Sequence, residues 1–136
     1  MDAQEHYYAD ALREIRNGRK TSHWIWFIFP QMAGLGYSPM AQEYGIKSQE
    51  EARAYLAHPV LRQRLLEITE ALLAHSKKGL FHSPKTAFEI LGTIDAIKVR
   101  SCMTLFDIVE PNGLFAEVLN TFYEGERDPL TLEKLS

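Results

Sequence analysis

The stretch PVLRQRLLEITEALLAH, residues 59–75, decides the fold class of this chain. Its apolar side chains recur every three or four residues, which is the spacing of a buried helical face. Proline suits the first turn of a helix, and the two lysines and the glycine at residues 77–79 are typical of a helix end. We therefore expect a central helix over residues 59–75. Its apolar positions are Leu61, Leu65, Leu66, Ile68, Leu72 and Leu73.

Helix start and stop signals continue on both sides of this segment. Residues 4–17 carry an apolar stripe and end at Gly18, a residue type that commonly follows a helix. Ser48 and Glu51 have the spacing of a capping box, which predicts a helix up to Ala57. The other expected helices begin at Ser38-Pro39, Ser83-Pro84, Thr93, Leu114 and Asp128-Pro129, and the first four end before Gly45, Gly92, Pro111 and Gly125.

No segment shows the alternating pattern and tight-turn residues of a β-hairpin. The composition, 46% hydrophobic and 24% charged residues in 136, is that of an ordinary globular domain and excludes a disordered chain. We predict a compact all-α array of short and medium helices that forms a single domain over residues 1–136.

Charge, cysteine content and apolar runs limit the function classes further. A net charge of −3 lacks the positive field of a dedicated nucleic-acid-binding protein, so a nucleic-acid partner is disfavoured. Cys102 is the single cysteine, and the N-terminus shows no basic and then apolar leader. The apolar run 24–30 is too short for a membrane span. We expect a soluble, cytoplasmic and monomeric protein.

Residues 21–31, TSHWIWFIFPQ, follow neither the helical nor the strand period. Two interpretations stay open: a short helix capped by Ser22 and ended before Pro30, which we favour, or a buried strand. Four residues here, His23, Trp24, Trp26 and Gln31, carry polar groups that need partners when buried. They are candidate ligand-binding residues, although buried polar groups also satisfy one another.

A second anomaly lies on the helix that follows Thr93. Lys98 and Ser101 interrupt the apolar stripe of that helix at a spacing of three residues. A lysine there must reach water, pair with a carboxylate such as Asp95, or bind an anionic ligand. The sequence thus adds Lys98 and Ser101 to the candidate ligand-binding residues.

Other site types find little support. The five histidines, at positions 6, 23, 58, 75 and 82, include no pair at the four-residue spacing of a helical zinc site, so we predict no metal. The short Gly34-Leu35-Gly36 element lacks the features of a phosphate-binding loop, and we predict no cofactor. The basic run 13–20 is typical of a solvated helix end, but Lys20 remains a candidate for phosphate contact.

The motif GRKTSHWIWFIFPQ, residues 18–31, resembles a bacterial family of small proteins known as a domain of unknown function, sometimes labelled calpastatin. The resemblance extends to Tyr44-Gly45-Ile46, His58-Pro59 and Met103-Thr104-Leu105-Phe106, and so covers nearly the whole chain. It implies a compact all-helical domain. A more distant similarity to the NAD- and ADP-ribose-associated family implies a nucleotide-like ligand, because some members of that family remove ADP-ribose from modified groups.

These observations support three function hypotheses. The first is a pocket for an anionic or nucleotide-like small molecule, possessed by a binding protein or by a hydrolase of ADP-ribose-type substrates. In this hypothesis the phosphate is held by Lys20, Lys98 and His23. A base stacks on Trp24 or Trp26, and hydrogen bonds from Gln31 and Ser101 orient the ligand. The acid or base of a hydrolase would be Glu43 or Asp95. The second is a non-enzymatic protein-interaction module with an exposed aromatic patch. RNA binding through the basic run ranks last.

Overall fold

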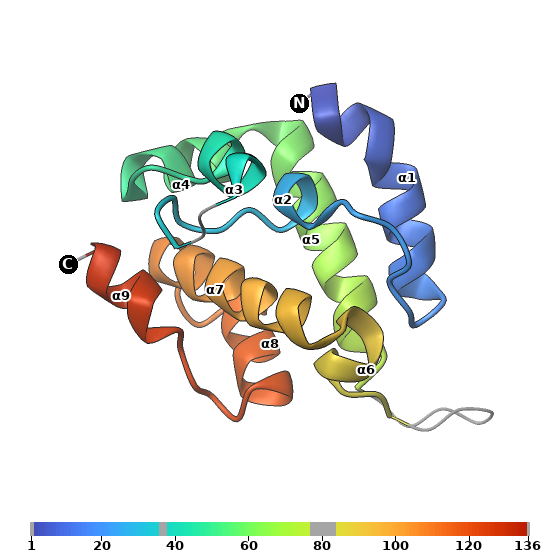
Figure 1. The fold of residues 1–136 in the computed structure, drawn as a ribbon. Coiled ribbons are helices and arrows are strands. Elements are labelled where there is room, and N and C mark those ends of the chain that lie inside the picture. The colour runs from blue at the N-terminus through green and yellow to red at the C-terminus, as the bar shows by residue number, and fades with distance from the viewer. Residues whose placement is uncertain (1, 36–37, 77–83, 136) are drawn as a thin grey trace.

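A computed structural model describes residues 2–35, 38–76 and 84–135. These residues form nine helices (Figure 1). The helices are α1 (Asp2–Arg16), α2 (Ile25–Ile28), α3 (Pro39–Tyr44), α4 (Gln49–Ala57), α5 (Pro59–Ala74), α6 (Ala87–Leu91), α7 (Thr93–Val109), α8 (Leu114–Phe122) and α9 (Pro129–Leu135). The described residues contain no strand beyond an isolated bridge, so the prediction of an all-α fold is confirmed.

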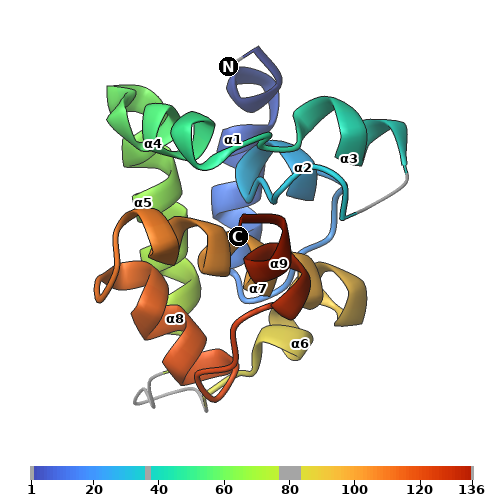
Figure 2. The same ribbon diagram turned by 90° about the vertical axis from the view of Figure 1, so that its left-hand side faces the viewer.

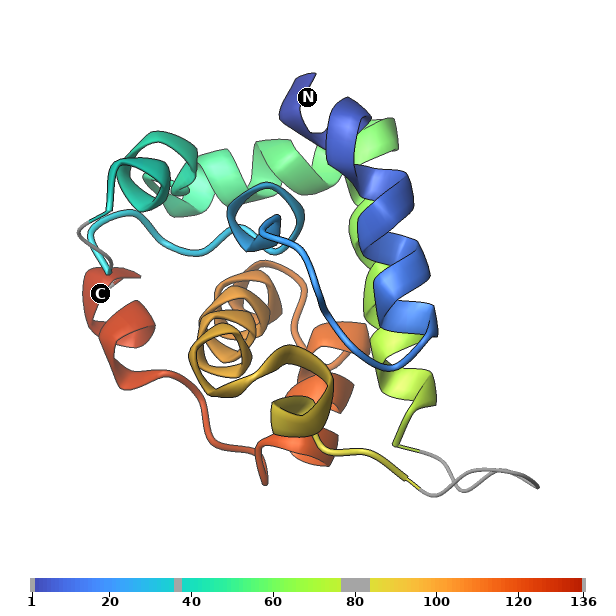
Figure 3. The same cartoon turned by 45° about the vertical axis from the view of Figure 1, so that its right-hand side comes forward.

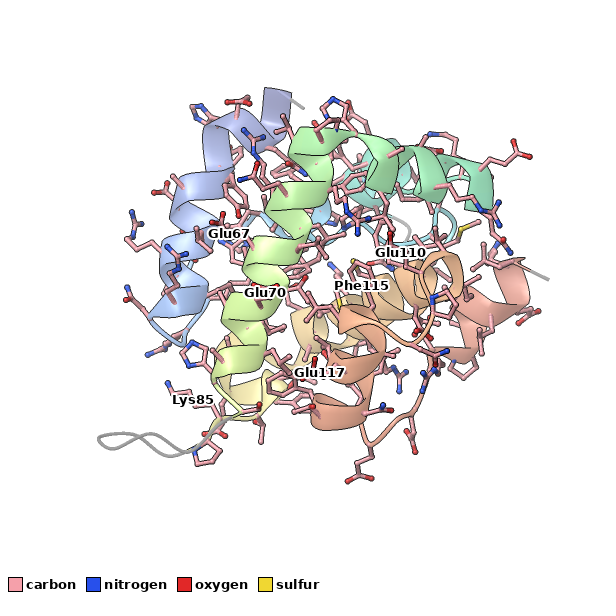
Figure 4. All side chains as sticks on the ribbon, turned by 180° about the vertical axis from the view of Figure 1, so that it is seen from behind. Glu67, Glu70, Lys85, Glu110, Phe115 and Glu117 are labelled. Carbon is pink, nitrogen blue, oxygen red and sulfur yellow. The ribbon has the colours of Figure 1, made fainter. Side chains whose placement is uncertain are left out.

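The helix at the centre of the molecule is α7, although the sequence analysis assigned that place to residues 59–75. Helix α7 packs against α4, α6, α8 and α9, and Figure 3 shows it surrounded by the other helices. Val99, Cys102 and Leu105 on α7 are wholly buried. Helix α5 instead lies behind α7, where it packs against α1, α4 and α8 and exposes one face (Figure 4). The leucine stripe of α5 predicted a buried face but not a central position.

Several predicted helix starts are confirmed by their hydrogen bonds. The Ser38 hydroxyl accepts from Ala41 N at 3.1 Å, and the Asp128 carboxylate accepts from Thr131 N at 3.1 Å. Ser48 accepts from Glu51 N at 3.1 Å, but the Glu51 carboxylate accepts from Lys47 N rather than from the Ser48 amide. Only half of the predicted capping box therefore forms at Ser48.

Two helix starts differ from the prediction. Helix α6 begins at Ala87 with Thr86 as its cap, because Thr86 and Glu89 form a complete capping box. The predicted cap Ser83 lies outside the described residues. Thr93 is the first residue of α7 rather than its cap, and Gly92 occupies the cap position with φ of 83°. A positive φ of this kind favours glycine, so Gly92 allows α6 and α7 to follow each other directly.

The aromatic segment contains the short helix α2 and not a strand, which confirms the favoured interpretation. Its N-cap residue is Trp24, however, and not the predicted Ser22. After Pro30 the chain runs beside the segment between α3 and α4: Ile46 N donates to Gln31 O at 2.9 Å, and Ala33 N donates to Ile46 O at 2.7 Å. These bonds fix residues 31–33, next to which α3 and α9 lie (Figure 2).

One hydrophobic core joins these helices. The largest fully buried side chains include Trp24 and Phe29 from the aromatic segment, Phe106 from α7 and Phe115 from α8. In the described part of the chain, every helix falls short of the length and apolar character required to cross a membrane.

Candidate functional site

Two neighbouring hollows open along α7. The first, which we call the α9 hollow, has a volume of about 370 Å³ and is bounded by α7, α9 and the segment between α2 and α3. Its polar lining residues are Gln31, Ser38, Lys98, Ser101 and Asp128. The second, the α2 hollow, has a volume of about 450 Å³. Its polar lining residues are Lys20, His23, Trp26, Thr93, Asp95 and Lys98.

Ile94 and Lys98 line both hollows, so we call the two together the Lys98 groove. The volume of each hollow lies in the range of small-molecule pockets, which is about 300 to 1,000 Å³. The candidates Lys20, His23 and Trp26 lie in the α2 hollow, and Gln31 and Ser101 lie in the α9 hollow. Segments separated by more than 60 residues therefore share one groove.

Lys98 has a distinctive environment. Its ammonium lies 4.9 Å from the centroid of the Trp26 ring, a cation–π contact. No carboxylate of the described residues lies within ion-pair distance of it. The expected alternative, a salt bridge between Lys98 and Asp95, is wrong, because Asp95 pairs with Lys20 instead.

Lys20 lies in the same groove, but its charge is compensated. Its Nζ lies 2.7 Å from Asp95 Oδ2 and 4.9 Å from the centroid of the Trp24 ring. The Lys20 side chain is only 7% exposed, and its backbone N donates to Ile90 O at 2.7 Å. The segment before α2 is thereby joined to the end of α6 and the start of α7. Lys20 thus forms a built-in ion pair in the wall of the α2 hollow.

The two tryptophans have different surroundings. Trp24 is fully buried and contributes to neither hollow, and its Nε1 donates to Glu14 Oε1 at 3.0 Å. The structure therefore separates Trp24 from the other candidate ligand-binding residues. Trp26 is half-buried, and its Nε1 lacks a hydrogen-bond partner within the described ranges. Of the two indoles, only that of Trp26 faces the groove.

Glu14 on α1 organises the segment that leads to α2, a role that the sequence analysis missed. Its Oε1 accepts from Thr21 N at 2.7 Å, from Ser22 N at 2.9 Å and from Trp24 Nε1. Burial raises the pKa of Glu14, but these hydrogen bonds lower it more, so the pKa is about 2. The signal in the sequence was a carboxylate three residues after the buried Ala11, on the same side of the helix.

Ser101 and Asp128 form the polar end of the α9 hollow. The Ser101 hydroxyl donates to Asp128 Oδ2 at 3.0 Å and lies 3.3 Å from Ile97 O. Asp128 also caps α9, and its backbone N donates to Thr104 Oγ1 at 3.0 Å. Its Oδ1 lies 3.5 Å from Arg100. The position of Asp128 before Pro129 predicts a helix cap but not a place in the groove.

The remaining candidates have simpler positions. His23 is exposed at the mouth of the α2 hollow, and Gln31 is half-buried in the α9 hollow. Glu43, one of the two candidate acids, lies in a third hollow of about 250 Å³ that Lys98 does not line. Over the described ranges, no three histidine, cysteine or acidic side chains are placed to hold a metal ion.

These features define a small all-helical protein with an open groove along its central helix. Residues 1–135 match the family described as "Protein of unknown function (DUF1810)", and the chain belongs to that family. It is also similar to the crystal structure of a conserved hypothetical protein, Rv1873 from Mycobacterium tuberculosis, with 42% sequence identity and a TM-score of 0.88. That match covers 98% of this chain and 91% of the other. No curated protein matches the chain.

Proposed function

We propose that the Lys98 groove binds a small anionic, nucleotide-like molecule. The observation that carries this proposal is the Lys98 ammonium, which lines both hollows and has no carboxylate partner in the described part of the chain. A partly desolvated cation gains more from an anion than a fully hydrated surface lysine does. An anionic ligand supplies the partner that the other groups of the groove do not.

The walls of the groove fit a ligand with an apolar ring. Ile94 is 71% exposed and Ile97 is 48% exposed, and both line the α9 hollow together with Leu130. A ring that covers these side chains removes apolar surface from water, which favours binding. Gln31 and Ser38 at the opposite wall offer hydrogen-bonding groups that can orient the ring.

The contacts support binding more directly than hydrolysis of an ADP-ribose-type substrate. An acid or base for hydrolysis must be able to reach the reacting atoms. Asp95 is held by Lys20, Asp128 accepts hydrogen bonds from Ser101 and Thr131, and Glu43 lies outside the groove. Binding is therefore the core of the proposal, and any hydrolysis would require Asp95 or Asp128 to exchange its present partners.

The alternative, a protein-interaction module with an aromatic patch, has weaker support. It requires at least one indole at the surface within a continuous apolar area. Trp24 is fully buried, and Trp26 packs against Phe27 with its ring under the Lys98 ammonium. The large exposed apolar residues near the groove are aliphatic and line the α9 hollow. A ligand groove accounts for them without an aromatic patch.

The test is a thermal-shift series with AMP, NAD and ADP-ribose on the wild-type protein and two lysine variants. Lys98→Ala removes the proposed anchor, whereas Lys47→Ala removes the same charge from an exposed position outside the groove. We expect at least one nucleotide to raise the Tm of the wild-type and Lys47→Ala proteins but not that of Lys98→Ala. A shift that persists in Lys98→Ala, or no shift with any nucleotide, contradicts the proposal.

A further inference from the structure

The charges around Lys98 restrict the kind of anion that the groove accepts. A carboxylate lines each hollow, and each carboxylate lies near a cation other than Lys98. Asp95 in the α2 hollow pairs with Lys20 at 2.7 Å, and Asp128 in the α9 hollow lies 3.5 Å from Arg100. Lys98 adds one positive charge to these two pairs. Arg100 does not line the groove and also lies 3.9 Å from Glu126, so Lys98 is distinguished as the one lysine or arginine of the groove lining that has no carboxylate partner in the described residues.

A terminal phosphate is a poor match for this arrangement. Such a group carries about −1.5 to −2 charges near pH 7, more than a single ammonium neutralises. The excess negative charge would face a carboxylate on each side of Lys98, and like charges across an interface are unfavourable. A monoanion matches the single uncompensated cation without this repulsion.

The position of Lys98 adds a geometric argument. Because it lines both hollows, an anion at its ammonium has space on two sides and not on one. Both hollows offer neutral hydrogen-bonding groups, Gln31 and Ser38 in one and Thr93 in the other. Ile94 and Ile97 add apolar surface, so each hollow suits an uncharged group that carries hydroxyls or amines.

From these observations we infer that Lys98 binds an internal monoanion, of the phosphodiester type, with one uncharged body in each hollow. This inference rests on the proposed function and specifies its ligand class. The overall charge of −3 opposes a long polyanion. The face opposite the groove displays Glu67, Glu70, Glu110 and Glu117 beside Lys85 (Figure 4). The ligand is therefore a small diester and not a nucleic acid.

Four probe ligands separate the effect of the ligand's charge on affinity from the effect of filling both hollows. AMP is dianionic with one flanking body, and its methyl ester is monoanionic with one such body. ADP-ribose is dianionic with two bodies, and the dinucleoside monophosphate ApA is monoanionic with two. Isothermal titration on the wild-type protein should give the tightest binding for ApA. We expect ApA to exceed ADP-ribose by at least about fivefold because of charge, and to exceed the AMP methyl ester by at least about tenfold because of the second body.

Two exposed α7 positions test which hollow each body occupies. Thr93→Glu places a carboxylate in the α2 hollow alone, and Ile97→Glu places one in the α9 hollow alone. Both side chains are exposed, so the fold should tolerate either change, which a circular dichroism melt verifies. Each variant should weaken ApA by at least about fivefold. The one-sided methyl ester should be weakened by only one of the two variants.

The outcomes distinguish this inference from the proposed function. If AMP or ADP-ribose binds as tightly as ApA, or if the methyl ester matches ApA, the diester inference is overturned. Nucleotide binding that depends on Lys98 would survive that result. If none of the four probes binds in a manner that Lys98→Ala abolishes and Lys47→Ala preserves, the proposed function fails as well.

Discussion

The two tryptophans of the aromatic segment lie two residues apart and show opposite relations to their surroundings. Trp24 is fully buried and its indole N–H donates to Glu14, whose carboxylate also holds two backbone amides. Trp26 is half-buried, its N–H has no partner in the described ranges, and the Lys98 ammonium lies over its ring. The same residue type thus serves the core on one side of the segment and the groove on the other.

This difference shows how a structural polar group can be separated from a candidate ligand-binding group. Buried polar atoms in folded proteins are nearly always hydrogen-bonded, so a satisfied group needs no ligand to explain it. The indole N–H of Trp24 is satisfied by the carboxylate of Glu14, and the charge of Lys20 is compensated by Asp95. In the described residues the Trp26 N–H has no hydrogen-bond partner and the Lys98 ammonium has no carboxylate partner, which is why the proposed function rests on them.

The largest effect is expected from Glu14→Ala. This change removes three hydrogen bonds to a carboxylate and leaves the buried Trp24 Nε1 unsatisfied. We expect a loss of about 3 kcal/mol in the free energy of unfolding, measured by urea denaturation. Glu70→Ala, at an exposed position on α5 (Figure 4), is the matched control and should change stability by less than about 0.5 kcal/mol. Equal effects of the two variants would refute the assigned role of Glu14.

Lowering the pH should also destabilise the protein, because protonation weakens the hydrogen bonds that the Glu14 carboxylate accepts from Trp24 and from the segment before it. The pKa of Glu14 is lowered from 4.5 to about 2 in the folded protein, so the folded state binds the proton less readily than the unfolded state does. The stabilisation is therefore present above about pH 4.5 and is lost as the pH falls towards 2. Glu14→Gln cannot titrate, and its stability should fall by about 2 kcal/mol less than that of the wild type between pH 5 and pH 2. Parallel pH profiles of the two proteins would contradict this.

A smaller and more selective effect is expected when each tryptophan is replaced by phenylalanine. Trp24→Phe removes a donor from Glu14 and leaves space in the core, so it should cost about 1.5 kcal/mol. Trp26→Phe removes an N–H that has no partner within the described residues, and should cost about 0.5 kcal/mol or less. Urea denaturation of both variants measures the difference. If Trp26→Phe were the more costly change, the comparison between the two indoles would be wrong.

The sequence predicted the helices well because caps, prolines and glycines act locally. Ser38, Asp128 and Pro59 each mark a helix start that the structure confirms. Helix α6 was placed three residues too early because Ser83-Pro84 and Thr86 with Glu89 are both start signals. Only the hydrogen bonds show that the second signal is used at Ala87.

The candidate site was predictable in part. Interruptions of apolar stripes identified Lys98 and Ser101, and the same rule applied to α1 would have identified Glu14. Pairing could not be predicted, because the partner of each charge depends on how distant segments pack. The ion pair of Asp95 illustrates this. The spacing in the sequence made Asp95 a possible partner of Lys98, but in the fold Asp95 pairs with Lys20. Lys98 is thereby left without a carboxylate partner in the described part of the chain.

The most direct test of this account is an NMR titration that follows the two indole N–H signals. Trp24→Phe and Trp26→Phe assign the signals, since each variant removes one of them. Titration of the wild-type protein with AMP and then with ApA should shift the Trp26 signal, leave the Trp24 signal in place, and have no effect in Lys98→Ala. A shift of the Trp24 signal alone, or no shift of either signal with both compounds, would contradict a ligand site at Lys98.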